Sequence, residues 1–222
     1  MSCLTLFAKE QFLVAPELQT QESYDRSAAS YDAKTRDFIL SLEMAQFTAP
    51  LSRGAVILDL GCGPGRDAKI FLEQGFEVVG VDFSSELLAI AKERAPKGEF
   101  FQRNIEDLYV FTPDYFDGIW ANASLLHIPK SSLPAVLKQM NKLLKLNGQL
   151  FVSVKKGEGE GFESDQRFGG VPKFWSYHQE DEMVRLLEEA GFQVQTCQID
   201  LTSRGAFQTH PFIQIFARKV NF

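Results

Sequence analysis

Apolar runs of strand length alternate with helical patterns over most of this chain. Continuous apolar runs of the kind that form buried parallel strands lie at residues 55–60 and 76–81. Runs at residues 99–103, 115–121 and 148–154 predict three further strands. Most of the stretches that separate these runs carry apolar side chains at helical spacing, whereas residues 104–108 are expected to form a loop. Strand and helix therefore alternate five times, which predicts an α/β fold with a parallel sheet covered by helices on both faces.

The C-terminal part predicts one more helix and two strands. Ser176 and Gln179 have the spacing of a capping box, and an apolar helical face follows until Gly191. The turn between the runs at 192–201 and 212–219 is too short for a helical crossover. We therefore expect the last two strands to pair in antiparallel fashion.

The N-terminal part divides near residue 22. Residues 1–21 predict an extension with no readable function, and residues 22–222 predict one domain. The domain begins with a helical pattern in which Phe38, Leu42 and Ala45 share one face. Two interpretations are open: a helix that only packs on the domain, or a cap over a ligand cleft that places Tyr24 or Tyr31 on the ligand.

Several polar segments directly follow predicted strands. Right-handed crossovers bring the carboxyl ends of parallel strands to one edge of the sheet, and ligands bind outside that edge. The segments expected there are residues 59–65, 82, 104–107 and 121–127.

The first of these segments is a glycine turn with a charged residue on each side. Gly61, Gly63 and Gly65 let the backbone turn sharply and let a ligand approach closely. Asp59 places a carboxylate before the turn, where it would repel phosphates and suit a cationic amino group. Asp82, which ends the second predicted strand, can accept hydrogen bonds from a ribose diol or can cap the next helix.

The spacing of the glycines separates two kinds of cofactor. A nicotinamide dinucleotide turn has the pattern G-x-G-x-x-G, and the position of its third small residue is occupied here by Arg66. Together with Asp59, this departure disfavours NAD(P) and favours a ligand that carries an amino group, such as S-adenosylmethionine.

With these motifs the chain resembles the class I S-adenosylmethionine-dependent methyltransferases, and among them the small bacterial enzymes that modify metabolites. The resemblance rests on V-I-L-D-L-G-C-G-P-G-R-D at 56–67, V-V-G-V-D-F-S at 78–84, N-I-E-D-L at 104–108, F-D-G-I-W-A-N-A-S-L-L-H-I-P at 116–129 and L-L-K-L-N-G-Q-L at 143–150. It implies a three-layer, Rossmann-like sheet of seven strands in the order 3-2-1-4-5-7-6, mostly parallel, with the last strand antiparallel.

The resemblance also implies the cofactor site. Gly61 and Gly63 would line the methionine end, Asp82 would bind the ribose, and Phe83 and Ile105 would enclose the adenine. Asn104 stands where many relatives have an aspartate, and its amide oxygen can still accept a bond from the adenine amino group. The full set of residues expected at the cofactor is Tyr31, Asp59, Gly61, Cys62, Gly63, Gly65, Asp82, Phe83, Asn104, Ile105 and Ala121.

The composition of the chain limits the kinds of molecule that it is expected to bind. The net charge of −6 disfavours a nucleic-acid substrate, which needs a basic surface. The three cysteines lie far apart, which fits a reducing cytoplasm, and the three histidines lack the neighbours of a metal site. No signal peptide or membrane span is expected. The predicted protein is a cytoplasmic monomer or homodimer that acts on a small molecule.

The residues that would contact the methyl acceptor are harder to identify from the sequence. His127 follows the fourth predicted strand and is either a general base or a histidine that packs at the start of the next helix. The glycine-containing loop at 155–177 is either a lid over the acceptor or a solvated acidic loop. As a lid it would place the side chains of Arg167, Phe168, Trp175 and Tyr177 on the substrate.

Two alternatives to a methyltransferase stay open. One is an NAD(P)-dependent oxidoreductase, which the residues on either side of the glycine turn disfavour. The other is a non-catalytic protein that binds S-adenosylmethionine, because no indispensable catalytic residue can be identified from the sequence.

Overall fold

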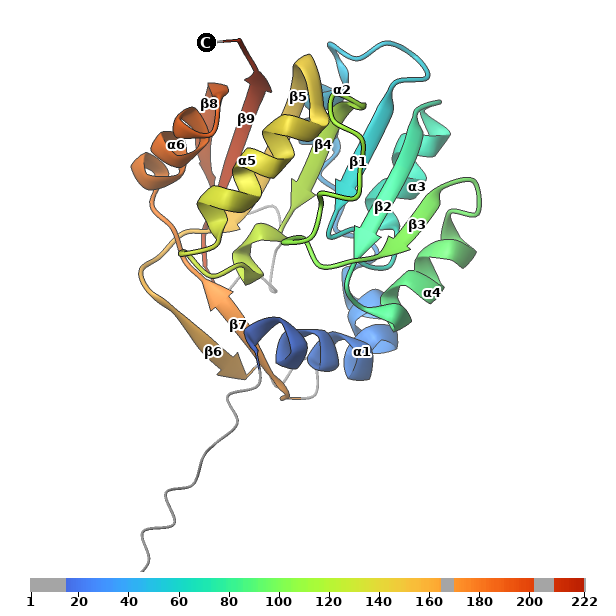
Figure 1. Ribbon diagram of the computed structural model, residues 1–222. Coiled ribbons are helices and arrows are strands. Elements are labelled where there is room, and N and C mark those ends of the chain that lie inside the picture. The colour runs from blue at the N-terminus through green and yellow to red at the C-terminus, as the bar shows by residue number, and fades with distance from the viewer. Residues whose placement is uncertain (1–14, 165–169, 202–209, 222) are drawn as a thin grey trace, which may run out of the picture.

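A seven-stranded sheet with helices on both faces forms the centre of the protein (Figure 1). The computed structural model describes residues 15–164, 170–201 and 210–221. Its helices are α1 (Pro16–Thr35), α2 (Ser41–Thr48), α3 (Arg66–Glu73), α4 (Ser85–Arg94), η1 (Leu125–His127, a 3₁₀ turn), α5 (Leu133–Leu143) and α6 (Glu180–Glu189). Its strands are β1 (Val56–Leu60), β2 (Glu77–Asp82), β3 (Glu99–Gln102), β4 (Phe116–Asn122), β5 (Leu144–Lys155), β6 (Glu160–Ser164), β7 (Pro172–Ser176), β8 (Phe192–Asp200) and β9 (Phe212–Lys219).

The strand order confirms the predicted topology. The large sheet runs β3-β2-β1-β4-β5-β9-β8, and β9 pairs in antiparallel fashion with both of its neighbours. Because β6 and β7 stand outside this sheet, β8 and β9 are its sixth and seventh strands in chain order. The observed order is therefore the predicted 3-2-1-4-5-7-6.

Two apolar layers hold the helices against the sheet. On one face, side chains of α5 and α6 pack on β4, β5 and β9. On the other face, α2 and α3 pack on β1, where the ring of Trp120 stacks on Phe151 with 4.0 Å between ring centroids. Strands β1, β2, β4 and β9 are buried over most of their length, which explains why they appear in the sequence as largely apolar runs.

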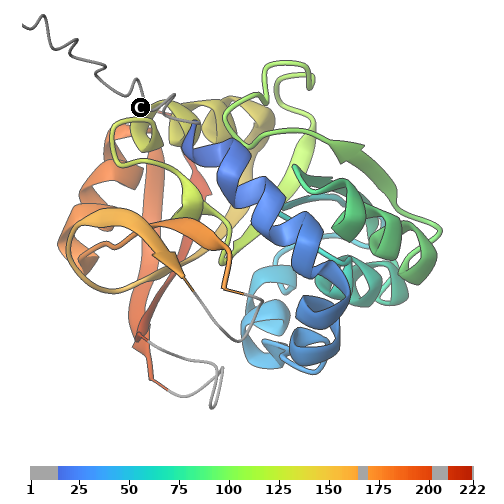
Figure 2. The same cartoon turned by 90° about the horizontal axis from the view of Figure 1, so that it is seen from below.

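Helix α1 crosses the carboxyl edge of the sheet, as the view from below shows most clearly (Figure 2). It packs against α4 and against β7. The hydroxyl of Ser23 donates to the carbonyl of Val171 at 2.9 Å, and the hydroxyl of Thr20 accepts from the N–H of Phe174 at 3.0 Å. Since α1 begins at Pro16, it runs across the predicted boundary between residues 21 and 22.

Three expectations about local structure were wrong: the apolar face of the helix after residue 35, the position of the capping box of α6, and the absence of strands between residues 155 and 177. The helical face of Phe38, Leu42 and Ala45 does not form, because α1 ends at Thr35 and the side chain of Leu42 is 83% exposed. The same spacing shifted by two residues is the buried one, and it brings Leu40, Met44 and Phe47 into the core.

The capping box of α6 also lies three residues later than expected. Gln179 and Glu182 form it, whereas Ser176 ends β7 and its hydroxyl pairs with His178. Within the segment expected to be a loop, β6 and β7 pair as an antiparallel hairpin that packs Phe162 on Phe174. Alternating glycines and acidic residues hide this strand pair in the sequence.

Among the described residues, no helix is both long enough and apolar enough to cross a bilayer.

Candidate functional site

A pocket with about 850 Å³ of empty space lies at the carboxyl edge of the sheet, beneath α1. Most of the predicted cofactor residues line it: Tyr31, Asp59, Gly61, Cys62, Gly63, Asp82, Phe83, Asn104 and Ile105. Gly65 and Ala121 do not.

The positions of these last two residues show what they do instead. Gly65 has a φ of 73° and begins α3, and a Cβ added to it would lie 2.9 Å from the Cα of Ala91. It allows the two helices α3 and α4 to approach closely. Ala121 is fully buried in the hydrophobic core beside the pocket.

The glycine turn follows β1 and has room for a ligand at one specific point. Gly61 has a φ of 75°, and an added Cβ would lie 2.3 Å from the Cβ of Ser124. Gly63 has a φ of 51°, and an added Cβ would meet nothing within 4 Å. The turn is therefore packed tightly at its first glycine and open toward the pocket at its second.

Asp82 connects the end of β2 to this turn. Its carboxylate accepts hydrogen bonds from the backbone N–H groups of Gly63 at 2.8 Å and Ser84 at 2.9 Å. Burial raises the pKa of Asp82 to about 6, and these backbone bonds oppose the rise. Each carboxylate oxygen keeps a lone pair for a further donor, as binding of a ribose diol requires.

Asp59 presents a buried carboxylate at the pocket wall. Its Oδ2 atom has no hydrogen-bond partner, and burial together with the nearby Asp67 and Asp82 raises its pKa well above the usual range. An unpaired buried carboxylate is costly unless a cation comes to it. The site thus favours a ligand that brings a positive charge to Asp59.

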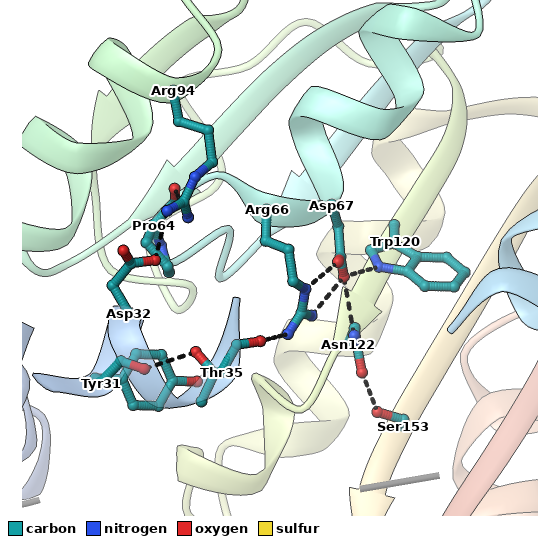
Figure 3. Close-up of polar contacts among 10 residues, drawn as sticks. All are labelled: Tyr31, Asp32, Thr35, Pro64, Arg66, Asp67, Arg94, Trp120, Asn122 and Ser153. Atoms are coloured by element: carbon teal, nitrogen blue, oxygen red, sulfur yellow. Dashed lines mark hydrogen bonds and ion pairs between the residues drawn. The ribbon is translucent and has the colours of Figure 1, made fainter. Parts of the chain in front are cut away.

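A charged network that the sequence did not reveal surrounds this end of the pocket (Figure 3). Arg66 pairs with Asp67 through two contacts, Nε to Oδ1 at 2.6 Å and Nη2 to Oδ2 at 3.0 Å. The same Oδ2 accepts from Trp120 Nε1 at 2.8 Å and from Asn122 Nδ2 at 2.9 Å. The only signal was the R-D pair directly after the glycine turn.

The same region fastens α1 over the pocket. Arg66 donates to the carbonyl of Thr35 at 3.2 Å. Arg94 of α4 pairs with Asp32 at 2.6 Å and donates to the carbonyl of Pro64 at 2.8 Å. Two arginines therefore join the end of α1 to the glycine turn, so that α1 covers the pocket as well as packing on the domain.

His127 lies at the other end of the pocket with both ring nitrogens bonded. Nδ1 is 2.6 Å from the carbonyl oxygen of Phe174, and Nε2 is 2.8 Å from the hydroxyl of Tyr24. Because a carbonyl only accepts, Nδ1 carries the proton and Nε2 accepts from Tyr24. Burial lowers the pKa of His127 to about 3, so the ring is neutral at physiological pH.

The structure separates the four residues expected at the acceptor. Trp175 stands beside His127, with 4.6 Å between ring centroids. Tyr177 is buried, donates to Glu163 at 2.7 Å and does not line the pocket. Arg167 and Phe168 lie outside the described residues.

Two further observations complete the site. The Oδ1 atom of Asn104 accepts from the N–H of Glu106 at 3.0 Å, which leaves it one lone pair toward the pocket. In the described part of the chain, no three histidine, cysteine or acidic side chains gather as metal ligands would.

Comparisons with known proteins point to one family. A family model described as a methyltransferase domain matches residues 57–148. An uncharacterized methyltransferase of Schizosaccharomyces pombe is 27% identical over 190 residues, which cover 78% of this chain and 70% of that protein. A ubiquinone biosynthesis O-methyltransferase of Xylella fastidiosa is 36% identical over 108 residues, 47% of this chain and 43% of the relative. The chain thus spans less than half of the latter protein.

A solved structure agrees over most of the chain. The 1,6-didemethyltoxoflavin-N1-methyltransferase of Burkholderia thailandensis, solved with 1,6-didemethyltoxoflavin and S-adenosylhomocysteine bound, is 25% identical. It covers 94% of this chain and 92% of its own, with a TM-score of 0.71.

The pocket fits the cofactor of that family. Asp59 offers an unpaired carboxylate oxygen to an ammonium group, Asp82 can bind a ribose, and the open side of Gly63 leaves room for the ligand between them. The sheet order, the glycine turn and these relatives support a class I S-adenosylmethionine-dependent methyltransferase.

Proposed function

We propose that this protein transfers a methyl group from S-adenosylmethionine to a small-molecule acceptor by in-line displacement. The observation that carries the proposal is the buried Oδ2 of Asp59, which has no hydrogen-bond partner, on a residue that lines the same pocket as Asp82. A cationic amino group relieves this charge, and a nicotinamide dinucleotide brings phosphates that increase the repulsion.

The residues at the cofactor have separate roles in this proposal. Asp59 and the glycine turn hold the methionine amino group, Arg66 supplies a cation for the methionine carboxylate, and Asp82 accepts the ribose hydroxyls. Phe83 and Ile105 line the pocket where they can enclose the adenine. The sulfonium of the bound cofactor supplies an activated methyl group.

The end of the pocket at His127, where we expect the acceptor and which we call the acceptor end, has a shape that supports a small substrate. Tyr24 of α1 and His127 line this end, and β7 packs against α1 next to them. An acceptor must therefore fit beneath α1. The ubiquinone and didemethyltoxoflavin enzymes named above, which also act on small molecules, support the same proposal.

The contribution of this chain to the reaction is mainly alignment. Holding a nucleophile in line with a reacting bond can lower a barrier by about 7–11 kcal/mol. His127, the predicted base, has its Nε2 occupied by the hydroxyl of Tyr24. A proton from the acceptor would reach His127 through Tyr24: the Tyr24 oxygen takes the proton while its own hydroxyl proton moves to Nε2.

Calorimetric titration with S-adenosylmethionine and, separately, with NAD tests the cofactor. We expect S-adenosylmethionine to bind and NAD not to bind. The Asp59→Asn variant should bind S-adenosylmethionine at least tenfold more weakly, whereas Glu99→Gln on the exposed side of β3 should bind it normally. Binding of NAD alone would contradict the proposal and support the oxidoreductase alternative.

Transfer is tested with methyl-labelled S-adenosylmethionine and a deproteinised metabolite extract. We expect labelled small molecules that depend on the active protein. A protein that binds the cofactor and labels nothing in repeated extracts would be the non-catalytic binding protein instead.

A further inference from the structure

Strand β3 forms one outer edge of the large sheet, far from the terminal antiparallel strands (Figure 1). In the described part of the chain, β3 pairs only with β2. Phe101 in this strand is 41% exposed, and the neighbouring Glu99, Gln102 and Arg103 are exposed as well. An edge strand presents a row of backbone groups to which another chain can add a strand.

The hydrogen bonds of β3 to β2 fix which of its residues point their backbone groups outward. The N–H of Arg103 donates to the carbonyl of Asp82 in β2 at 2.9 Å. Because the N–H and C=O groups of a strand point to the same side at every second residue, those of Phe101 also point toward β2. The backbone groups of Phe100 and Gln102 therefore point to the open side, and a further strand would bond to these two residues.

A second copy of β3 fits this edge when the two strands run antiparallel and Phe101 of one copy faces Phe101 of the other. In that register, Phe100 of each copy exchanges backbone hydrogen bonds with Gln102 of the other, so that the outward groups of both strands are bonded. The same register sets Glu99 of each copy opposite Arg103 of the other. Registers centred on Phe100 or on Gln102 also use the outward groups, but neither brings Glu99 opposite Arg103.

The charges on β3 favour the register centred on Phe101. Charged side chains on an edge strand usually prevent pairing with another copy, because like charges then meet across the two strands. Glu99 and Arg103 lie on the same face of the sheet as Phe101, one on each side of it, so two-fold symmetry brings unlike charges together twice. Arg103 also contacts Asp107 at 3.7 Å, but both side chains are partly exposed and such a pair contributes little.

Apolar side chains beside β3 add surface that this pairing can bury. The ring of Phe101 packs on Phe111 with 5.8 Å between ring centroids. The segment that contains Phe111 also carries Tyr109, which is 79% exposed, and Val110, which is 47% exposed. A two-fold axis perpendicular to the sheet at Phe101 keeps both copies of this cluster on the same face, on the two sides of the junction. Exposed apolar side chains grouped in this way are typical of an interaction surface.

We propose that the protein forms a symmetric homodimer in which the two β3 strands pair in antiparallel fashion about Phe101. The two sheets then join into one continuous sheet, and Glu99 of each copy pairs with Arg103 of the other. None of these three residues lines the pocket, so the interface leaves the candidate site open. The inference does not depend on the proposed function.

The first experiment tests the register by reversing charges. Analytical ultracentrifugation at micromolar concentrations should give the unchanged protein twice the 25.0 kDa mass of one chain. Glu99→Lys leaves only positive charges at the two positions and Arg103→Glu leaves only negative ones, so each variant should dimerise roughly tenfold more weakly or worse. An equimolar mixture of the two variants should form dimers again, because each then supplies the charge that the other lacks. A variant with both changes should also recover the dimer.

The matched controls are Glu189→Lys and Arg185→Glu, which make the same charge changes in an exposed pair of α6. They should leave the mass unchanged, and circular dichroism should show that all variants are folded. An unchanged protein that stays monomeric over the whole concentration range would overturn the proposal. So would a dimer that both single variants of β3 retain, since it would use another surface, and so would a mixture of the two variants that fails to form dimers.

The second experiment tests the position of the two-fold axis. In this register the two copies of Phe101 form a non-hydrogen-bonded pair, whose Cα atoms lie about 4.5 Å apart and within reach of a disulfide. Phe101→Cys should therefore form a covalent dimer when oxidised with diamide, which a non-reducing gel detects and dithiothreitol reverses. The controls are the unchanged protein and Leu146→Cys in β5, where the replaced side chain is 49% exposed, and neither should form this dimer. Equal cross-linking of both cysteine variants would contradict an axis at Phe101.

Discussion

Arg66 and Asp67 are neighbours in the sequence and form a bidentate ion pair at the pocket wall, with Nε 2.6 Å from Oδ1 and Nη2 3.0 Å from Oδ2 (Figure 3). Both side chains are largely buried, and Asp67 also accepts from Trp120 and Asn122. Although burial opposes it, the Arg66 charge together with these hydrogen bonds holds the pKa of Asp67 below its usual value.

Replacing Asp67 with Asn should therefore destabilise the fold severely. The change leaves the charge of Arg66 buried without its partner, and loss of one partner of a buried pair costs about 3–5 kcal/mol. Urea unfolding followed by circular dichroism measures the loss. The control is Glu189→Gln, because the Arg185–Glu189 pair is exposed and should change stability by less than about 1 kcal/mol. Equal, small effects in both variants would show that the buried network contributes little.

Asp82 should make cofactor binding depend on pH. Its pKa is about 6, so the carboxylate gains a proton as the pH falls through 6 and can then no longer accept charge-assisted bonds from the ribose. If only the ionised form binds, affinity for S-adenosylmethionine should fall about tenfold between pH 7.5 and pH 5. Calorimetry at a series of pH values checks this.

The Asp82→Ala variant separates this effect from other groups. It should bind S-adenosylmethionine at least tenfold more weakly at pH 7.5, about 1.4 kcal/mol or more, and should lose the step near pH 6. Asp59 also has a raised pKa, so a residual dependence in the variant belongs to that carboxyl. Unchanged affinity in a folded variant would remove Asp82 from the ribose site.

The hydrogen bond between Tyr24 and His127 should contribute measurably to stability. Tyr24→Phe leaves the buried Nε2 of His127 without its donor, and an unsatisfied buried acceptor costs about 1–3 kcal/mol. Tyr109→Phe is the control, since Tyr109 is 79% exposed. If the tyrosine also relays a proton, Tyr24→Phe lowers kcat as well. A rate that varies with a pKa between 5 and 8 in wild-type protein and not in His127→Asn would contradict the low pKa of His127.

Gly61 should tolerate no side chain. In Gly61→Ala the new Cβ would lie 2.3 Å from the Cβ of Ser124, and the φ of 75° adds strain of about 1–3 kcal/mol. We expect loss of both stability and S-adenosylmethionine binding.

Gly54→Ala provides the comparison for this prediction. Gly54 has a similar φ of 79°, but an added Cβ meets nothing within 4 Å. The Gly54→Ala variant should lose stability through backbone strain alone, and its affinity for the cofactor should be unchanged. Equal effects of the two substitutions would mean that contact with Ser124 does not limit position 61.

Local patterns were sufficient for much of the fold. Continuous apolar runs locate the buried strands, and the resemblance carried by the motifs gives the strand order that the structure confirms. The glycine turn, Asp59 and Asp82 were also predicted to share one edge, because parallel strands bring their carboxyl ends together. Their place in one pocket follows from topology and needs no knowledge of side-chain packing.

Helix periodicity was less reliable, since the same spacing fits more than one set of apolar residues. In α2 it favoured Leu42, which is exposed, over Met44 and Phe47, which are buried against the sheet. The boundary of α6 was misplaced because Ser176 fits a capping box as well as Gln179 does, and only the course of β7 decides between them.

The acceptor end was decided by tertiary structure alone. Tyr24 and His127 are 103 residues apart, Ser23 and Val171 are 148 apart, and these contacts bring α1, η1 and β7 to one pocket. The sequence by itself determined the cofactor end, because its chemistry is carried by short motifs at strand ends. Long-range packing determined the acceptor end, because its residues come from segments that no local pattern connects.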